Sequence, residues 1–267
     1  MAFEFDNDGF LSERSSELED DIYATYHDLF EGARRINHDC HALLFAADIR
    51  NRDRQAIIVA TLFMRVLDHY QATIILLGRG VVAPARVTLR ALVECTLKLR
   101  AIAINPDALE AFINEDLVDR LKLINKARNN AYPNLEETRA ATTDDGVEEL
   151  KREITQRGAK EIRTEQWSRL AGMHDWYITN YSLLSKAVHT QVRELEDYLK
   201  LGNSDEIQQL HYAPSMDELP LLIHTAAHCV LIAVSAFDKE FEMGFGPKGD
   251  EHAKFVDAAF RAIDDGI

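Results

Sequence analysis

The chain has 267 residues, of which 46% are hydrophobic and 28% are charged, a balance typical of globular proteins and not of disordered chains. Its formal net charge of −15 argues against gripping duplex nucleic acid or an anionic membrane, because both need a basic surface. The acidic N-terminal sequence does not resemble a signal peptide, and the apolar stretches 56–64 and 72–77 are too short to span a bilayer. We therefore expect a cytoplasmic protein without a membrane partner, for which RNA and small molecules remain open as ligands.

Three cysteines, Cys40, Cys95 and Cys229, lie far apart in apolar helical contexts. Their spacing matches neither a disulfide framework nor a metal knuckle, so we expect three buried, reduced thiols.

Apolar residues recur three and four residues apart through the first half of the chain, which is the pattern of amphipathic helices. Gly78 to Gly80 has the composition of a left-handed helix cap, and Asn105-Pro106 is a stop signal. The predicted helices cover residues 12–49, 51–77, 84–105 and 107–129.

Residues 134–165 are highly charged and nearly free of large apolar side chains. We expect them to form a solvated helix or pair of helices that projects from the rest of the chain, because they offer little to bury.

The second half of the chain is also predicted to be helical. A helix is expected from about residue 175 to 190 with an extension to 199, and a strongly apolar, central helix from 219 to 241. Residues 208–214 are predicted to be irregular or briefly extended, and a turn at 244–249 precedes a short terminal helix. The fold class is therefore all-α, a single helical bundle over residues 1–267 with a charged helical insertion.

The third predicted helix carries a local excess of positive charge. Arg86, Arg90, Glu94 and Lys98 follow one another at four-residue spacing and form one stripe beside apolar rows. Such a stripe is often only the solvent face of an amphipathic helix.

A second stripe lies on the helix predicted from residue 175, where Tyr181, Ser185 and His189 are also four residues apart. Apolar neighbours on both helices favour burial of these polar groups, and buried polar groups must pair. We therefore expect a hydrogen bond from Arg90 or Glu94 to one of these three residues, in a network that either fixes helix register or lines a pocket.

The stretch from Gly80 to Glu94, with its Leu-Arg-x-x-x-Glu motif, resembles a bacterial all-helical family of unknown function. The stretch Tyr181 to His189 is similar to the second motif of that family, Tyr-x-x-Leu-Ser-x-x-x-His. The family looks related to AbiV-type abortive-infection proteins of phage defence. The resemblance covers roughly residues 50–240 and supports Arg90, Glu94, Tyr181, Ser185 and His189 as one group, without implying a reaction.

A metal-independent ribonuclease of the HEPN type is the alternative, because its motif is an Arg and a His with four to six residues between them. Arg169 with His174, and Arg34 or Arg35 with His41, have this spacing. About two such matches are expected by chance in a chain of this composition. In this alternative His189 would act as acid and base and Arg90 would bind phosphate.

His224 and His228 are four residues apart on the apolar helix, a spacing that can chelate a metal. Thr225, Ala226 and Ala227 stand between them, so the zincin glutamate is missing, and core histidines are more often paired than metal-bound. We assign neither a metal nor a cofactor from the sequence. Our leading expectation is a bacterial regulatory or phage-defence-associated protein that acts through binding, as a homo-oligomer.

Overall fold

The computed structural model describes residues 6–188, 192–201 and 206–264, without the side chains of residues 193, 194, 201 and 264. Within these ranges the protein is overwhelmingly helical, which confirms the predicted all-α class. The α-helices are α1 (Ser15–Thr25), α2 (His27–Ala46), α3 (Arg54–Gly78), α4 (Val82–Ile104), α5 (Pro106–Asn129), α6 (Glu136–Ala140), α7 (Asp144–Arg157), α8 (Thr164–Leu170), α9 (His174–Trp176), α10 (Ser182–Val188), α11 (Leu219–Phe241) and α12 (Gly246–Asp264). The shorter elements are η1 (Gly9–Leu11), η2 (Pro133–Leu135), the π-helical turn η3 (Tyr177–Tyr181), η4 (Val192–Tyr198) and the strands β1 (Leu199–Leu201) and β2 (Ile207–Leu210).

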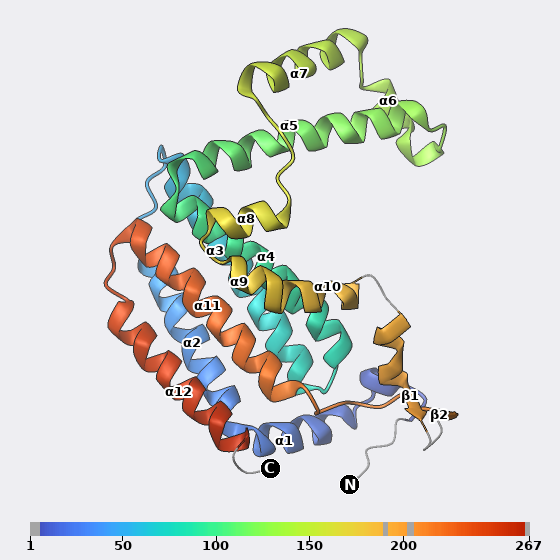
Figure 1. Cartoon of the computed structure of the whole chain (residues 1–267), viewed down its shortest axis with the longest axis vertical. Helices are drawn as coiled ribbons and strands as arrows, with labels where there is room; N and C mark the ends of the chain where they lie inside the picture. Colours follow the sequence, from blue (N-terminus) through green and yellow to red (C-terminus); the bar gives the residue numbers. More distant parts are fainter. Residues whose placement is uncertain (1–5, 189–191, 202–205, 265–267) are drawn as a thin grey trace.

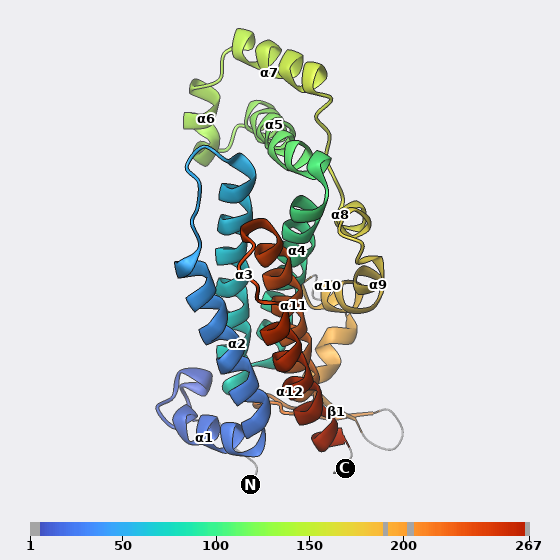
Figure 2. The same cartoon turned by 90° about the vertical axis from the view of Figure 1, so that its left-hand side faces the viewer.

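The core lies between α2, α3, α4, α11 and α12, which run side by side in Figures 1 and 2. Helix α11 packs against the other four, as predicted for a central helix. Its Phe237 stacks on Phe63 of α3 with ring centroids 4.5 Å apart. Apolar residues on nearly every face of α11 make this arrangement favourable, since a helix that is apolar all round must be covered all round.

By length and composition alone, α11 could also cross a membrane. In the structure 67% of its most apolar window is buried inside the protein, and the core helix of a soluble protein passes the same test.

The first predicted helix, residues 12–49, is wrong as a single element. The chain leaves helical geometry at Tyr26, which separates α1 from α2. In Figure 2, α1 lies across the end of the bundle while α2 runs along it. No glycine or proline marks this break, so it comes from the packing of both helices against the core and not from local sequence.

Gly80 fixes the turn between α3 and α4. It has a φ of +67°, and the Val81 amide donates to the Leu76 carbonyl at 2.9 Å, which closes α3 as the sequence predicts. A Cβ at Gly80 would also stand 2.8 Å from the Cβ of Pro214. The segment after β2 therefore rests directly on this turn, and the Ser215 amide donates to the Gly80 carbonyl at 3.1 Å.

Helix α5 leads away from the bundle, and α6 and α7 return along its outer part (Figure 1). Asn105 caps α5 by accepting from the Asp107 amide, as expected at an Asn-Pro start. Val147 and Leu150 of α7 are buried, as is Ala127 of α5, so this segment has a small apolar contact of its own.

Three further boundaries differ from the sequence prediction. Residues 164–170 form α8, anchored by the buried Trp167, whereas the predicted charged helical segment ended at residue 165. The predicted helix from 175 begins at His174, contains the π-helical turn and does not continue as α-helix to 199. Helix α12 already begins at Gly246, inside the predicted turn. The brief extended segment near 208 is confirmed as β2, which pairs with β1.

Candidate functional site

The two predicted stripes meet at Arg90 and Tyr181. Nη2 of Arg90 donates to the Tyr181 hydroxyl at 2.5 Å, and the guanidinium carbon lies 4.8 Å from the centre of the tyrosine ring. The Thr164 hydroxyl lies 3.2 Å from the same phenolic oxygen. The predicted hydrogen bond between the stripes is therefore confirmed, and Tyr181 is buried.

Glu94 lies at the edge of this contact. Its Oε2 is 3.4 Å from Nη1 of Arg90, and its Oε1 is 3.7 Å from Nζ of Lys98. The side chains of Arg90 and Glu94 are 22% and 29% exposed to solvent, so the pair lies at the margin of the bundle and not inside the core. Nε of Arg90 is nevertheless buried and has no hydrogen-bond partner among the described residues.

The other two members of the predicted group are not brought together with Arg90. Ser185 is half-buried on α10 and makes no hydrogen bond to Arg90 or Glu94. His189 lies outside the described residues. The π-helical turn instead stacks Tyr177 on Tyr181, with centroids 5.3 Å apart.

The Arg–His pairs of the ribonuclease motif have other partners. Arg169 pairs with Glu165 at 2.9 Å, while Nδ1 of His174 lies 3.3 Å from the Ser168 hydroxyl. Arg35 pairs with Glu31 at 2.8 Å. Nδ1 of His41 lies 2.8 Å from the Asn37 carbonyl.

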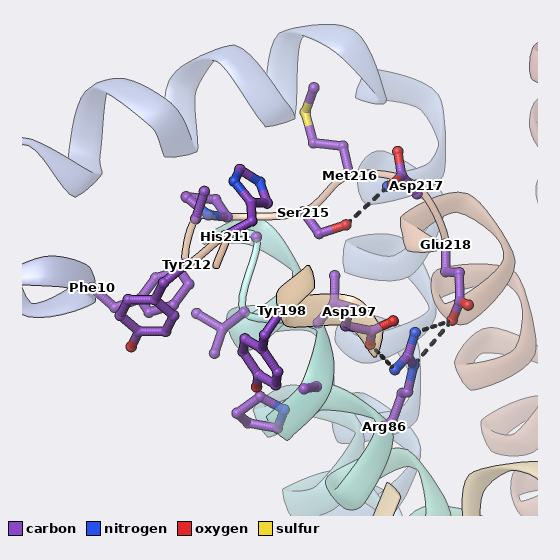
Figure 3. Close-up of a pocket in the computed structure, with 17 residues that line it drawn as sticks. Phe10, Arg86, Asp197, Tyr198, His211, Tyr212, Ser215, Met216, Asp217 and Glu218 are labelled. Carbon is purple, nitrogen blue, oxygen red and sulfur yellow. Dashed lines mark hydrogen bonds and ion pairs between the residues drawn. The ribbon is translucent and has the colours of Figure 1, made fainter. Parts of the chain in front are cut away.

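A cavity of about 520 Å³ lies where the start of α4, the end of η4 and the segment leading into α11 meet. Figure 3 shows Arg86 with Glu218 at one end of it, and Phe10 with Tyr212 at the other. We call it the α4 cavity. The residues lining it are Phe10, Gly80, Val81, Val82, Ala83, Pro84, Arg86, Asp197, Tyr198, His211, Tyr212, Ala213, Pro214, Ser215, Met216, Asp217 and Glu218.

Arg86 ties the three segments together at the polar end of the α4 cavity. Its Nη1 lies 2.6 Å from Asp197, and its Nε and Nη2 lie 3.0 and 2.8 Å from Oε2 of Glu218. Burial opposes the charged form of this guanidinium, but the hydrogen bonds to Asp197 and Glu218 outweigh it and raise the pKa of Arg86. The side chain, only 12% exposed, therefore stays cationic between two half-exposed carboxylates.

Three aromatic rings form the other end of the α4 cavity. Tyr212 meets Phe10 edge to face, with centroids 6.0 Å apart, and Tyr198 lies 6.4 Å from Tyr212. Such rings offer flat apolar faces to a planar ligand. The sequence signal for this end was weak, because Phe10 lies far along the chain from Tyr198 and Tyr212, which flank the β1–β2 hairpin.

The metal candidates His224 and His228 point at one carboxylate that the sequence prediction missed. Nε2 of each histidine lies 2.8 Å from Oδ1 of Asp257, on α12. Burial lowers the pKa of His224, although its hydrogen bond to Asp257 opposes this. Burial would raise the pKa of Asp257, but hydrogen bonds from the two histidines lower it. Asp257 is 29 residues from His228, so no local motif joins them.

A second pairing ties α12 to α2. Nε2 of His252 lies 2.8 Å from Oδ2 of Asp39, and Nζ of Lys248 lies 2.7 Å from Oδ1. Burial would raise the pKa of Asp39, but hydrogen bonds from Lys248 and His252 lower it. This carboxylate is thus shared by one imidazole and one ammonium group.

The cysteines are buried or half-buried. Burial raises the pKa of Cys40 to about 12 and also raises that of Cys229, so neither is a ready nucleophile. Cys95 is only half-buried, in contrast to the predicted full burial.

Residues 56–207, more than half of the chain, match the model of a family described as a family of unknown function (DUF5677). The matched region holds all five residues of the predicted group, together with Arg86, Asp197 and Tyr198 of the α4 cavity. It ends before His224, His228 and Asp257. No curated protein and no solved structure matches the chain.

Proposed function

We propose that this chain, which belongs to the family of unknown function DUF5677, acts by binding a small planar ligand in the α4 cavity. Its role is that of a cytoplasmic bacterial regulatory protein of phage defence, and it works as a homo-oligomer. The observation that carries the binding proposal is the cavity itself, which combines aromatic faces with a fixed set of charged groups. The link to defence rests on the resemblance of the two motifs to a bacterial helical family that looks related to AbiV-type abortive-infection proteins.

The charges at the α4 cavity favour a cationic or amine-bearing ligand. The residues lining the α4 cavity include three carboxylates (Asp197, Asp217 and Glu218) and one guanidinium (Arg86), which leaves a formal charge of −2 with His211 neutral. The donors of Arg86 are already engaged by Asp197 and Glu218. These carboxylates keep oxygens that accept from the amino groups of a ligand, while the rings of Tyr198 and Tyr212 stack on its plane.

The same charges disfavour RNA as the ligand of the α4 cavity, because its phosphate groups would be repelled by the carboxylates there. A ribonuclease would instead depend on Arg90, whose guanidinium is engaged by Tyr181 and Glu94. Purified protein incubated with RNA tests this alternative. Cleavage that disappears in Arg90→Ala and His189→Ala would replace the binding proposal with a ribonuclease.

The binding proposal is tested by fluorescence titration of the full chain with proflavine, a planar cation, and with fluorescein, a planar anion. We expect saturable binding of proflavine, and about 5- to 150-fold weaker binding by Tyr212→Ala, since an aromatic stack is worth about 1–3 kcal/mol per base. Tyr132→Ala is the matched control, because both tyrosines are 64% exposed and Tyr132 lies outside the α4 cavity. Equal affinity of both variants would overturn the α4 cavity as the site.

The defence role is tested in a bacterial host that expresses the protein and is challenged with phages. We expect fewer plaques with the wild-type protein and no protection by Tyr212→Ala at equal protein level. Protection that is unchanged in this variant would separate defence from the α4 cavity.

A further inference from the structure

The cluster of His224, His228 and Asp257 lies apart from the α4 cavity, between the N-terminal half of α11 and the C-terminal half of α12. Their candidate ligand atoms all lie within 4.8 Å of one another. The side chains of His224, His228 and Asp257 are 23%, 27% and 34% exposed to solvent, so one side of the cluster is open to water. An ion can reach it without opening of the bundle.

We propose that His224, His228 and Asp257 bind one divalent transition-metal ion of the zinc class, which links α12 to α11. Two imidazole nitrogens and one carboxylate oxygen are a donor set that suits Zn²⁺, whereas Mg²⁺ and Ca²⁺ prefer oxygen donors. Three protein ligands leave at least one coordination position for water or another ligand. Affinity for such a site rises from Mn²⁺ and Fe²⁺ to Cu²⁺ and is lower again for Zn²⁺, so the ligand types define a class of ions rather than a single metal.

Tetrahedral coordination of Zn²⁺ by these three residues needs only small side-chain movements. Ligand atoms about 2.0–2.1 Å from a tetrahedral Zn²⁺ are roughly 3.3 Å apart. Each histidine nitrogen is 2.8 Å from the Asp257 oxygen, so these separations must open by about half an ångström. Side-chain rotation provides that distance while α11 and α12 stay in place. The imidazole rings are already adjacent, with centroids 4.5 Å apart, and Phe260 stacks on His224.

The arrangement differs from an ordinary ion pair between helices. At Asp39, one imidazole and one ammonium share the carboxylate, and the ammonium of Lys248 supplies the neutralising charge. At Asp257, two imidazoles converge on a single oxygen, and no described Lys or Arg pairs with that carboxylate. A bound cation would supply the charge that Lys248 supplies at Asp39.

The experiment is calorimetric titration of chelator-treated full-length protein with Zn²⁺, with Mg²⁺ as the control ion. We expect one Zn²⁺ per chain and no response to Mg²⁺. Loss of a group that merely orients a ligand typically weakens binding about 10–100-fold, so Asp257→Asn and His228→Asn should each weaken it at least about 100-fold. His252→Asn is the matched control and should bind as the wild type does.

Co²⁺ absorption keeps the test decisive if a variant is unstable. His228→Cys should retain binding and add a thiolate-to-cobalt charge-transfer band that the wild-type complex lacks. No Zn²⁺ binding by the wild type, equal binding by Asp257→Asn, or binding to His228→Cys without the new band would each overturn the proposal. None of these outcomes affects the α4 cavity, whose probes and variants are separate.

Discussion

Tyr181 is the one residue of the second stripe that meets Arg90 in the described structure. Its hydroxyl accepts from Arg90, while its ring lies under the guanidinium and beside Tyr177. The contact joins α4 to the π-helical turn, at a place where both polar groups are largely withdrawn from water. Because the acceptor serves a charged donor, it should contribute more than a neutral hydrogen bond.

We therefore expect Tyr181→Phe to lower the free energy of unfolding by about 1.5–3 kcal/mol, the range for hydrogen bonds to charged groups. Tyr177→Phe, on the neighbouring stacked ring, should change it by no more than about 0.5 kcal/mol. Glu94→Ala should also stay below about 1 kcal/mol, because its ion pair with Arg90 is part-exposed. Urea denaturation of the three variants is the measurement. Equal midpoints for Tyr181→Phe and Tyr177→Phe would contradict the role of the hydroxyl.

Asp39 gives a prediction for the dependence of stability on pH. Its pKa lies below the ordinary value of 3.8, because the hydrogen bonds from Lys248 and His252 outweigh its burial. A carboxyl group with a depressed folded-state pKa stabilises the protein above its unfolded pKa, and this stabilisation is lost as the pH falls through the folded value. Asp39→Asn should therefore lower the free energy of unfolding by roughly 1–3 kcal/mol at pH 5 to 6. The difference between wild type and variant should disappear on acidification toward about pH 2.

The matched control for Asp39 is Asp28→Asn. Asp28 also pairs with a histidine, His27, but its side chain is 72% exposed. We expect a change of no more than about 0.5 kcal/mol at every pH. If the stability difference between the wild type and Asp39→Asn stays constant from neutral to acid pH, the carboxylate charge is not the source of the stabilisation.

At the scale of elements, α12 is held against α2 by a close approach at Gly32. A Cβ on Gly32 would stand 2.9 Å from a methyl group of Val256 and 3.1 Å from the ring of Phe255. Valine is stiff at its first torsion, so it cannot turn away cheaply. We expect Gly32→Ala to destabilise the protein by about 1–3 kcal/mol, although alanine is the better helix former.

Gly249→Ala on α12 is the comparison, because its new Cβ would meet Phe245 at an ordinary 3.6 Å. This variant should be neutral or more stable by up to about 1 kcal/mol. Thermal melts of both variants make the comparison. A Gly32→Ala variant at least as stable as the wild type would mean that α2 and α12 do not pack as closely as described.

The elements that the sequence predicted well carry their own boundary signals. Helix α11 has an apolar run whose length matches the helix, and α3 ends where Gly80 allows a left-handed residue. The break at Tyr26 and helix α8 have no comparable local signal, because tertiary packing sets them. The hydrogen bond from Arg90 to Tyr181 was predictable from two matching four-residue spacings. Asp257 was not, because only the fold brings α12 beside His224 and His228.

At the scale of the whole molecule, the net negative charge of the chain agrees in sign with the cavity proposed to bind a cationic ligand. The chain carries −15 overall, and the α4 cavity repeats this sign locally with three carboxylates against one guanidinium. The aromatic rings at its other end give shape selection, while the carboxylates give charge selection. Asp217 is exposed and is not paired with Arg86, so its charge can be changed without removing the clamp between Arg86, Asp197 and Glu218.

The most direct test of ligand binding in the α4 cavity is the ratio of proflavine to fluorescein affinity in the wild type and in Asp217→Lys. The substitution changes the formal charge of the cavity from −2 to 0, so proflavine should bind at least about tenfold more weakly and fluorescein more tightly. Asp145→Lys, on α7 outside the α4 cavity, makes the same change to the net charge of the chain and should leave the ratio unchanged. An unchanged ratio in Asp217→Lys, or an equal shift in both variants, would contradict the account.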